Sequence, residues 1–165
     1  MQIFTTHGTQ LYTTFNSTAG YIGPFVHPSH AVQLPTGQFL VSHSSSLHRV
    51  CLVGVDGAVV RSYCGQKGSQ LAQMNYPTGL AVDREGRVLV ADWRSNRLSV
   101  IDQSLSSAHE MSVCVDGGLE GPNSLWYDQS RRRLYSGMED KMIVIGNLKN
   151  FRTEYLILCV VCAKR

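Results

Sequence analysis

The 165-residue sequence predicts an all-β chain in which one structural unit is repeated along the chain. The clearest copy runs from residue 76 to 102 and reads YPTGLAVDREGRVLVADWRSNRLSVID. Its opening Pro77-Thr78-Gly79 has counterparts at Pro28-Ser29-His30, which lies 49 residues earlier, and at Pro122-Asn123-Ser124, which lies 45 residues later. A period of about 40 to 50 residues with several short strands per unit is typical of a β-propeller blade.

The central copy contains four short runs that are rich in Val, Ile and Leu. Gly, Asp, Asn and Ser, which favour turns, bound these runs. We expect strands at 79–83, 87–92, 97–102 and 111–116. Gly86 can adopt the positive φ that a tight hairpin turn between the first two strands requires.

The flanking copies predict the same arrangement of strands. The preceding copy predicts strands at 29–34, 38–43, 49–55 and 58–64, and the following copy predicts them at 123–128, 132–138, 141–147 and 154–161. Two N-terminal segments, Met1–Thr6 and Thr9–Phe15, match the outer two strands of a further blade. No window has convincing 3.6-residue periodicity, so we expect almost no helix.

These repeats indicate one propeller segment with internal boundaries. We expect an outer half-blade and connector at 1–23, followed by complete blades at 24–73, 74–118 and 119–165. Propellers normally have four or more blades, so about three and a half cannot close a ring. We therefore expect a β-propeller fragment of four-stranded antiparallel blades, with self-association or poor solubility through its open blade faces.

The central copy resembles the NHL repeat. The resemblance rests on the pattern Pro-x-Gly-Leu-Ala-Val-Asp, Gly, Val-Leu-Val-Ala-Asp and Asn-x-Arg-Leu, which is met almost completely at 77–98. The structural positions of the repeat are Pro77, Gly79, Asp83, Gly86 and Asp92. The connector at 65–77 is similar to the spacer between NHL repeats, and the copy is most similar to the C-terminal propellers of tripartite-motif proteins.

The resemblance implies a platform that binds a protein or single-stranded RNA. In tripartite-motif relatives, separate RING, B-box and coiled-coil modules supply ubiquitin transfer and dimerisation. This sequence has neither a RING-type Cys/His array nor a heptad run. We therefore expect no enzymatic activity from this chain, and a ubiquitin-ligase module would have to lie elsewhere in a parent protein.

The loop after the second strand of the central copy combines an aromatic residue with two arginines. The loop residues are Trp93, Arg94, Asn96 and Arg97. Tyr76 lies in the connector between blades, which should emerge on the same side. A planar ring beside guanidinium groups can stack a base and hold a phosphate, or accept an acidic peptide. We expect these five residues to form a partner-binding site.

Two charged features also have structural explanations. Asp92 can accept hydrogen bonds from loop amides and from the Arg97 guanidinium, and we expect this pair chiefly to lock its loop. The arginines at 84, 87 and 131–133 fall at the opposite end of the blades. Charged turns of this kind are usually solvated, so we do not expect a binding site there.

A group of histidines keeps a second class of function open. Its members are His27, His30, His43 and His48. Metal-dependent propeller hydrolases and lyases, such as lactonase-like and amidating-lyase-like enzymes, place such ligands around the central channel. The spacing matches no zinc pattern, and the other copies have no equivalent set. We expect neither a metal nor another cofactor; the metal content of the full-length protein would separate the two readings.

The composition is that of a globular chain, with 43% hydrophobic residues and a net charge of +3. This charge neither requires nor excludes binding of nucleic acid. The longest apolar run, Tyr155–Cys162, is too short to cross a membrane, and the N-terminus has no signal-peptide pattern. The CxxC pair Cys159 and Cys162 lies in an expected outer strand, which favours ordinary strand cysteines. Reduced thiols indicate a cytoplasmic location, although an extracellular parent stays open.

Overall fold

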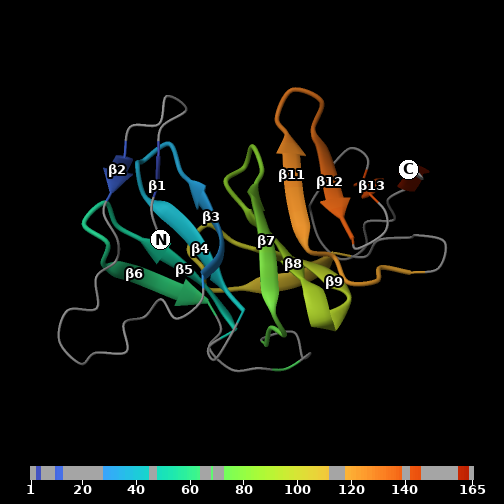
Figure 1. Ribbon diagram of the computed structural model, residues 1–165, viewed down its shortest axis with the longest axis horizontal. Helices are drawn as coiled ribbons and strands as arrows, with labels where there is room; N and C mark the ends of the chain where they lie inside the picture. The colour runs from blue at the N-terminus through green and yellow to red at the C-terminus, as the bar shows by residue number, and fades with distance from the viewer. Residues whose placement is uncertain are drawn as a thin grey trace.

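The structure is a computed structural model, and it shows three four-stranded antiparallel sheets and one two-stranded sheet (Figure 1). The residues that it describes are 3–4, 10–12, 28–44, 48–63, 68, 73–111, 118–138, 142–145 and 160–163. Across these residues the only helix is the short 3-10 helix η1, Trp93–Ser95. The all-β prediction is therefore confirmed.

Each four-stranded sheet is one blade, with its strands paired in sequence order. Blade 1 consists of β3 (Pro28–Gln33), β4 (Phe39–His43), β5 (Arg49–Val53) and β6 (Val59–Tyr63). Blade 2 consists of β7 (Pro77–Val82), β8 (Val88–Asp92), β9 (Arg97–Ile101) and β10 (Ala108–Met111). Blade 3 consists of β11 (Ser124–Asp128), β12 (Arg133–Gly137), β13 (Met142–Ile145) and β14 (Val160–Ala163). The strands β1 (Ile3–Phe4) and β2 (Gln10–Tyr12) pair with each other.

The fourth strand of blade 2 begins earlier than the sequence predicted. We expected it at 111–116, of which only Met111 lies within the described residues, and β10 spans Ala108–Met111. The preceding turn is short because the Asp102 carboxylate accepts hydrogen bonds from the Ser106 amide and hydroxyl, at 2.8 and 2.7 Å. The chain therefore re-enters the sheet at Ala108. The strand was missed because two of its four residues are charged or polar and exposed, as suits the outer edge of a blade. Most of the strand expected at 154–161 lies outside the described residues.

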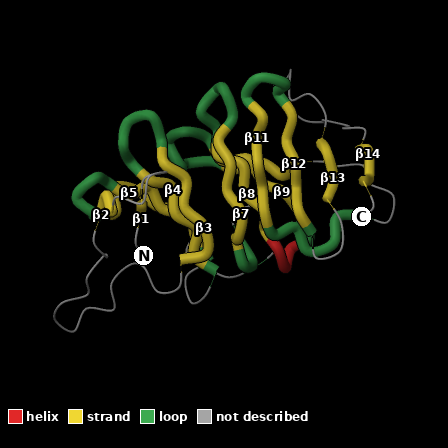
Figure 2. Tube along the Cα trace, turned by 45° about the horizontal axis from the view of Figure 1, so that its top comes forward, coloured by secondary structure: helices red, strands yellow, loops and turns green. Residues whose placement is uncertain are grey.

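The first strand of each blade lies innermost. In Figures 1 and 2, β7 stands between β3 and β11, and it contacts both. At Gly79 in β7, a Cβ atom would lie 2.8 Å from the Leu125 amide nitrogen and 2.8 Å from the Ser124 Cα of β11. The inner strands thus approach so closely that only glycine fits at this position.

Two apolar cores hold the blades together. Leu80, Val88 and Val90 of blade 2 pack with Leu40 and Val50 of blade 1. The opposite face of blade 2 packs against blade 3, through the residues Ala81, Leu89, Leu98, Val100, Leu125, Tyr127 and Leu134. All five residues of β8 and of β9 are buried, because a central blade is covered on both faces.

Candidate partner-binding site

The loop that carries the predicted site meets the connector between blades 1 and 2. The Trp93 amide donates a hydrogen bond to the Tyr76 carbonyl at 3.1 Å, and the Arg94 amide donates to the Asn75 carbonyl at 3.0 Å. Figure 2 shows η1, in red, at the edge of the blades opposite the turn that joins β11 to β12. Connector and loop therefore share one end of the blades, which we call the connector side.

Arg94 stacks on the aromatic residues of the connector side. Its guanidinium carbon lies 4.1 Å from the centre of the Tyr76 ring and 5.3 Å from that of the Trp93 ring. The two rings meet edge to face, with centroids 5.8 Å apart. Arg94 is exposed, whereas both rings are partly buried. This cation–π arrangement holds the guanidinium in place while leaving it at the surface, where it can meet an anionic group.

Arg97, in contrast, is buried, and its guanidinium bonds to the backbone of the connector. Its Nε donates to Asp92 Oδ2 at 3.0 Å, and its Nη2 donates to the Gln73 carbonyl at 2.6 Å. Asp92 Oδ1 accepts the Asn75 amide at 2.6 Å. Burial raises the pKa of Asp92, against the opposing effects of the Asn75 amide and the Arg97 charge. The predicted ion pair is present, and it fixes the connector as well as its own loop.

Asn96 and His48 occupy equivalent places in blades 2 and 1. Each has a positive φ, 51° and 35°, and each precedes the third strand of its blade. Asn96 Oδ1 accepts the Gly121 amide at 2.9 Å, and His48 Nδ1 accepts the Tyr76 amide at 3.0 Å. Gly121 and Tyr76 in turn precede the prolines that open the next blade. We call each of these bonds a junction clamp, because it ties one blade to the start of the next.

A second histidine of blade 1 also bonds to blade 2. His30 Nδ1 accepts the Leu80 amide at 3.0 Å, and burial lowers the pKa of His30. Its own amide donates to Ser42 Oγ at 3.1 Å, and that hydroxyl donates to the Thr78 carbonyl at 2.7 Å. In the described part of the chain, no three His, Cys, Asp or Glu side chains gather where they could hold a metal ion. His27 lies outside that part.

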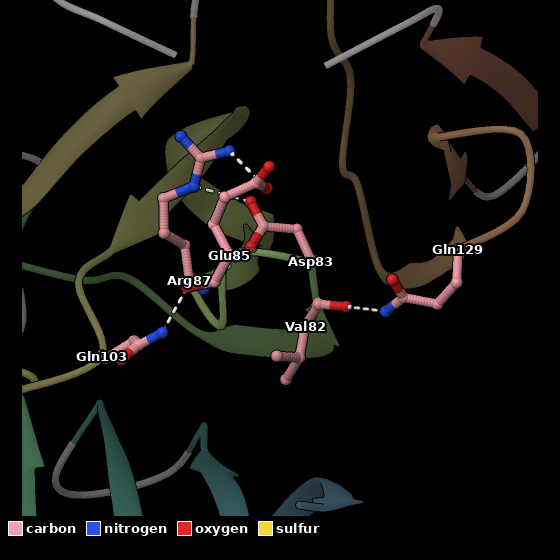
Figure 3. Close-up of polar contacts among 6 residues, drawn as sticks. All are labelled: Val82, Asp83, Glu85, Arg87, Gln103 and Gln129. Atoms are coloured by element: carbon pink, nitrogen blue, oxygen red, sulfur yellow. Dashed lines mark hydrogen bonds and ion pairs between the residues drawn. The ribbon is translucent and has the colours of Figure 1, made fainter. Parts of the chain in front are cut away.

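At the opposite end of the blades, the Arg87 side chain lies in the turn between β7 and β8 (Figure 3). Asp83 accepts the Arg87 amide at 2.8 Å and Arg87 Nε at 2.6 Å, and Arg87 also reaches Glu85 at 3.2 Å. Burial raises the pKa of Asp83, partly offset by Arg87. Gln129 of blade 3 donates to the Val82 carbonyl at 2.9 Å. Gly86 has the positive φ that was predicted for this turn, +76°.

The cysteines that the structure describes belong to strands. Cys51 is buried in β5, and burial raises its pKa to about 11, so the thiol stays protonated at neutral pH. Cys162 lies in β14, and Cys159 lies outside the described residues.

Residues 74–101, which form most of blade 2, match the family model of the NHL repeat. No curated protein sequence matches the chain. Similar solved structures include virginiamycin B lyase from Staphylococcus aureus, with 17% identity and a TM-score of 0.62 over 99% of this chain and 47% of that chain. Hydrazine synthase from Kuenenia stuttgartiensis matches with 21% identity and a TM-score of 0.56 over 77% and 36% of the two chains. Dihydro-heme d1 dehydrogenase NirN matches with 13% identity and a TM-score of 0.60 over 82% and 28%.

These likenesses show the fold: the chain forms consecutive blades of a β-propeller. It spans about half the length of the Staphylococcus aureus lyase, or 47%. The described residues include no helix of the length and hydropathy that crossing a bilayer demands.

The matches also correct the expectation that the chain is not an enzyme. That expectation came from the resemblance to binding platforms of the tripartite-motif type. The same arrangement of blades occurs in virginiamycin B lyase and in a streptogramin B lyase, so the fold is no argument against catalysis.

Proposed function

We propose that this chain is part of an NHL-type propeller that binds a protein or single-stranded RNA through its connector side. The binding residues would be Tyr76, Trp93 and Arg94, with Asn96 at the rim and Arg97 as internal support. One observation carries the proposal: the Arg94 guanidinium is exposed and stacked 4.1 Å above the Tyr76 ring. An arginine that is already ordered loses little further side-chain freedom when it binds a phosphate or a carboxylate.

The surroundings of Arg94 support this role. Its amide and that of Trp93 are both bonded to the connector, so the backbone under the site is fixed. The neighbouring Arg97 is already paired with Asp92, which leaves Arg94 as the loop's exposed cation. An aromatic surface with one ordered guanidinium matches an aromatic or planar group that lies next to a negative charge. Both an unpaired base with its phosphate and an acidic peptide have that chemistry.

A double variant tests the proposal. Trp93→Ala with Arg94→Ala should weaken binding by about 1–3 kcal/mol, because it removes both the stacking surface and the ordered cation. Binding would be measured by fluorescence anisotropy with two probes, a labelled oligouridylate of about ten nucleotides and a labelled acidic peptide. Circular dichroism would verify that the variant keeps its sheets.

The matched control removes two arginines at the other end of the blades. Arg131→Ala with Arg132→Ala should change little beyond a salt-sensitive association rate. If this control loses binding while the Trp93/Arg94 variant binds both probes normally, the binding face lies at the turn end. The proposal would also be contradicted if the unmodified chain bound neither the oligouridylate nor the acidic peptide.

Three finer parts belong to the same proposal. We infer a tripartite-motif-like parent from the central repeat, and a cytoplasmic location from cysteines such as Cys51, which is a buried free thiol. We also infer self-association through an open blade face. Trp126 in β11 is 60% exposed and lies against Tyr135 with ring centroids 5.0 Å apart, so a covering surface would bury both rings.

A parent enzyme of the lyase type is the second candidate. The observation that favours it is the likeness to virginiamycin B lyase over 99% of this chain. A metal-dependent hydrolase or lyase would retain about one divalent metal ion per chain after dialysis, because such sites hold the metal through several protein ligands. Metal analysis of the purified full-length protein therefore separates this candidate from the binding platform.

A further inference from the structure

The two junctions between blades use clamps of different chemistry. Between blades 1 and 2, His48 Nδ1 accepts the Tyr76 amide at 3.0 Å. Between blades 2 and 3, Asn96 Oδ1 accepts the Gly121 amide at 2.9 Å. The geometry is the same in both, but an amide oxygen does not titrate and an imidazole does.

The His48 clamp exists only when the ring is neutral. A neutral imidazole that carries its proton on Nε2 can accept a hydrogen bond at Nδ1, whereas the protonated ring has an N–H at both positions. Protonation would therefore set an N–H group against the Tyr76 N–H. His48 is 3% exposed, so water has little access to replace the lost bond.

The same clamp adjoins the partner-binding site. The His48 and Tyr76 rings lie 4.7 Å apart, centre to centre, and the Arg94 guanidinium lies over the Tyr76 ring. A charged His48 would bring a second cation to a ring that already holds one. Arg49, the next residue along the chain, is itself a cation, and the Asp92 carboxylate is already paired with Arg97. His43, at the other end of the same loop, is a second buried titratable group.

We propose that His48 is a pH-sensitive clamp whose protonation releases the Tyr76 amide, loosens the junction of blades 1 and 2 and disperses the Tyr76–Arg94 stack. Loss of partner binding in acid follows from this and rests on the function proposed above. The release of the Tyr76 amide does not rest on it, since this bond forms without any partner.

His30 acts in the same direction at the same junction. Its Nδ1 accepts the Leu80 amide, and burial lowers its pKa. A histidine with a lower pKa in the folded chain binds fewer protons there than in the unfolded chain. Its contribution to stability is therefore full above the ordinary pKa of about 6.5 and declines as the pH falls below that value.

Amide hydrogen exchange on the full chain tests the clamp directly. Protection factors, corrected for the intrinsic exchange rate, would be measured for Tyr76 and Gly121 at about pH 7.5 and about pH 5.0. In the unmodified chain, the protection of Tyr76 should fall by about tenfold between these pH values. The protection of Gly121 should stay constant, which makes the second junction an internal control.

The variant His48→Asn removes the titration and keeps the acceptor, because Asn96 already performs this role in blade 2. Relative to Gly121, its Tyr76 protection should fall much less with pH than in the unmodified chain, because only the titration of His30 remains at this junction. The proposal is overturned if Tyr76 and Gly121 lose protection equally, if neither loses it, or if His48→Asn loses as much as the unmodified chain. A pH-dependent Tyr76 amide in a chain whose Trp93/Arg94 variant binds both probes normally would uphold the clamp and refute the binding site.

Discussion

The junction of blades 1 and 2 and the junction of blades 2 and 3 share one plan. In each, a residue with positive φ before the third strand accepts the amide that precedes the next blade's proline. The residue is His48 in the first junction and Asn96 in the second. The comparison teaches that the repeat fixes the position of an acceptor atom, whereas the residue type that provides this atom differs between blades. The strength of the hydrogen bond therefore depends on pH in one junction and not in the other.

The blades differ more in the pair that ends the second strand and begins the third. The paired residues are Asp92 and Arg97 in blade 2, His43 and Arg49 in blade 1, and Gly137 and Met142 in blade 3. Only blade 2 has an Asp–Arg pair at this register position, and it is also the blade that matches the NHL repeat. The repeat pattern is therefore strongest where a buried charge ties the connector to its blade.

Removal of this pair should give the largest loss of stability. Arg97→Ala leaves the buried Asp92 carboxylate without its cation and the Gln73 carbonyl without its donor. We expect the free energy of unfolding to fall by about 3–5 kcal/mol, as for other broken buried ion pairs. Urea titration followed by circular dichroism would measure the loss.

The comparison for this prediction is Arg131→Ala. Arg131 also pairs with a strand-end aspartate, at 3.1 Å from Asp128, but its side chain is 69% exposed. Solvent screening makes such a pair weak, so the midpoint should hardly move. Equal losses from Arg97→Ala and Arg131→Ala would show that burial of the Asp92–Arg97 pair has no special weight.

A substitution that fills the space between the inner strands β7 and β11 should cost less stability than Arg97→Ala, and only at the junction of blades 2 and 3. Gly79→Ala places a Cβ atom 2.8 Å from the backbone of β11, and we expect a loss of about 1–3 kcal/mol from overpacking. Gly118→Ala is the control, because its Cβ would meet no atom within 4 Å and only its positive φ would cost stability, about 1 kcal/mol. Urea titrations of both variants would decide, and a Gly79→Ala chain as stable as the unmodified one would contradict the close packing of β7 on β11.

Most of the fold could be predicted from the sequence because turn residues and apolar runs recur with the period of a blade. The fourth strand of blade 2 could not, since an exposed edge strand such as Ala108–Met111 lacks an apolar run. The meeting of Tyr76 with Trp93 and Arg94 was predictable, because connectors and second-to-third-strand loops emerge at one end of a blade.

The roles of two site residues required the structure. Arg97 lies in the same loop as Arg94, and sequence alone does not reveal that one guanidinium points inward and the other outward. The sequence groups His48 with candidate metal ligands because it lies close to three other histidines. Its part in a junction clamp depends on a positive φ in its loop, which only the structure shows. The available signal was its position directly before an arginine, 48 residues before the Asn96-Arg97 pair.

The central claim is that the residue type of each junction clamp sets how that junction responds to pH. Placing a histidine in the second junction tests this claim most directly. Asn96→His should leave the Gly121 amide protected at about pH 7.5, because a neutral imidazole can replace the amide oxygen, and histidine tolerates a positive φ. At about pH 5.0 the protection of Gly121 should fall by roughly threefold, less than at Tyr76 because Asn96 is exposed and His48 is buried. A Gly121 amide that stays equally protected at both pH values in the Asn96→His chain would contradict the account, since the chemistry of the clamp would then not set the response of its junction.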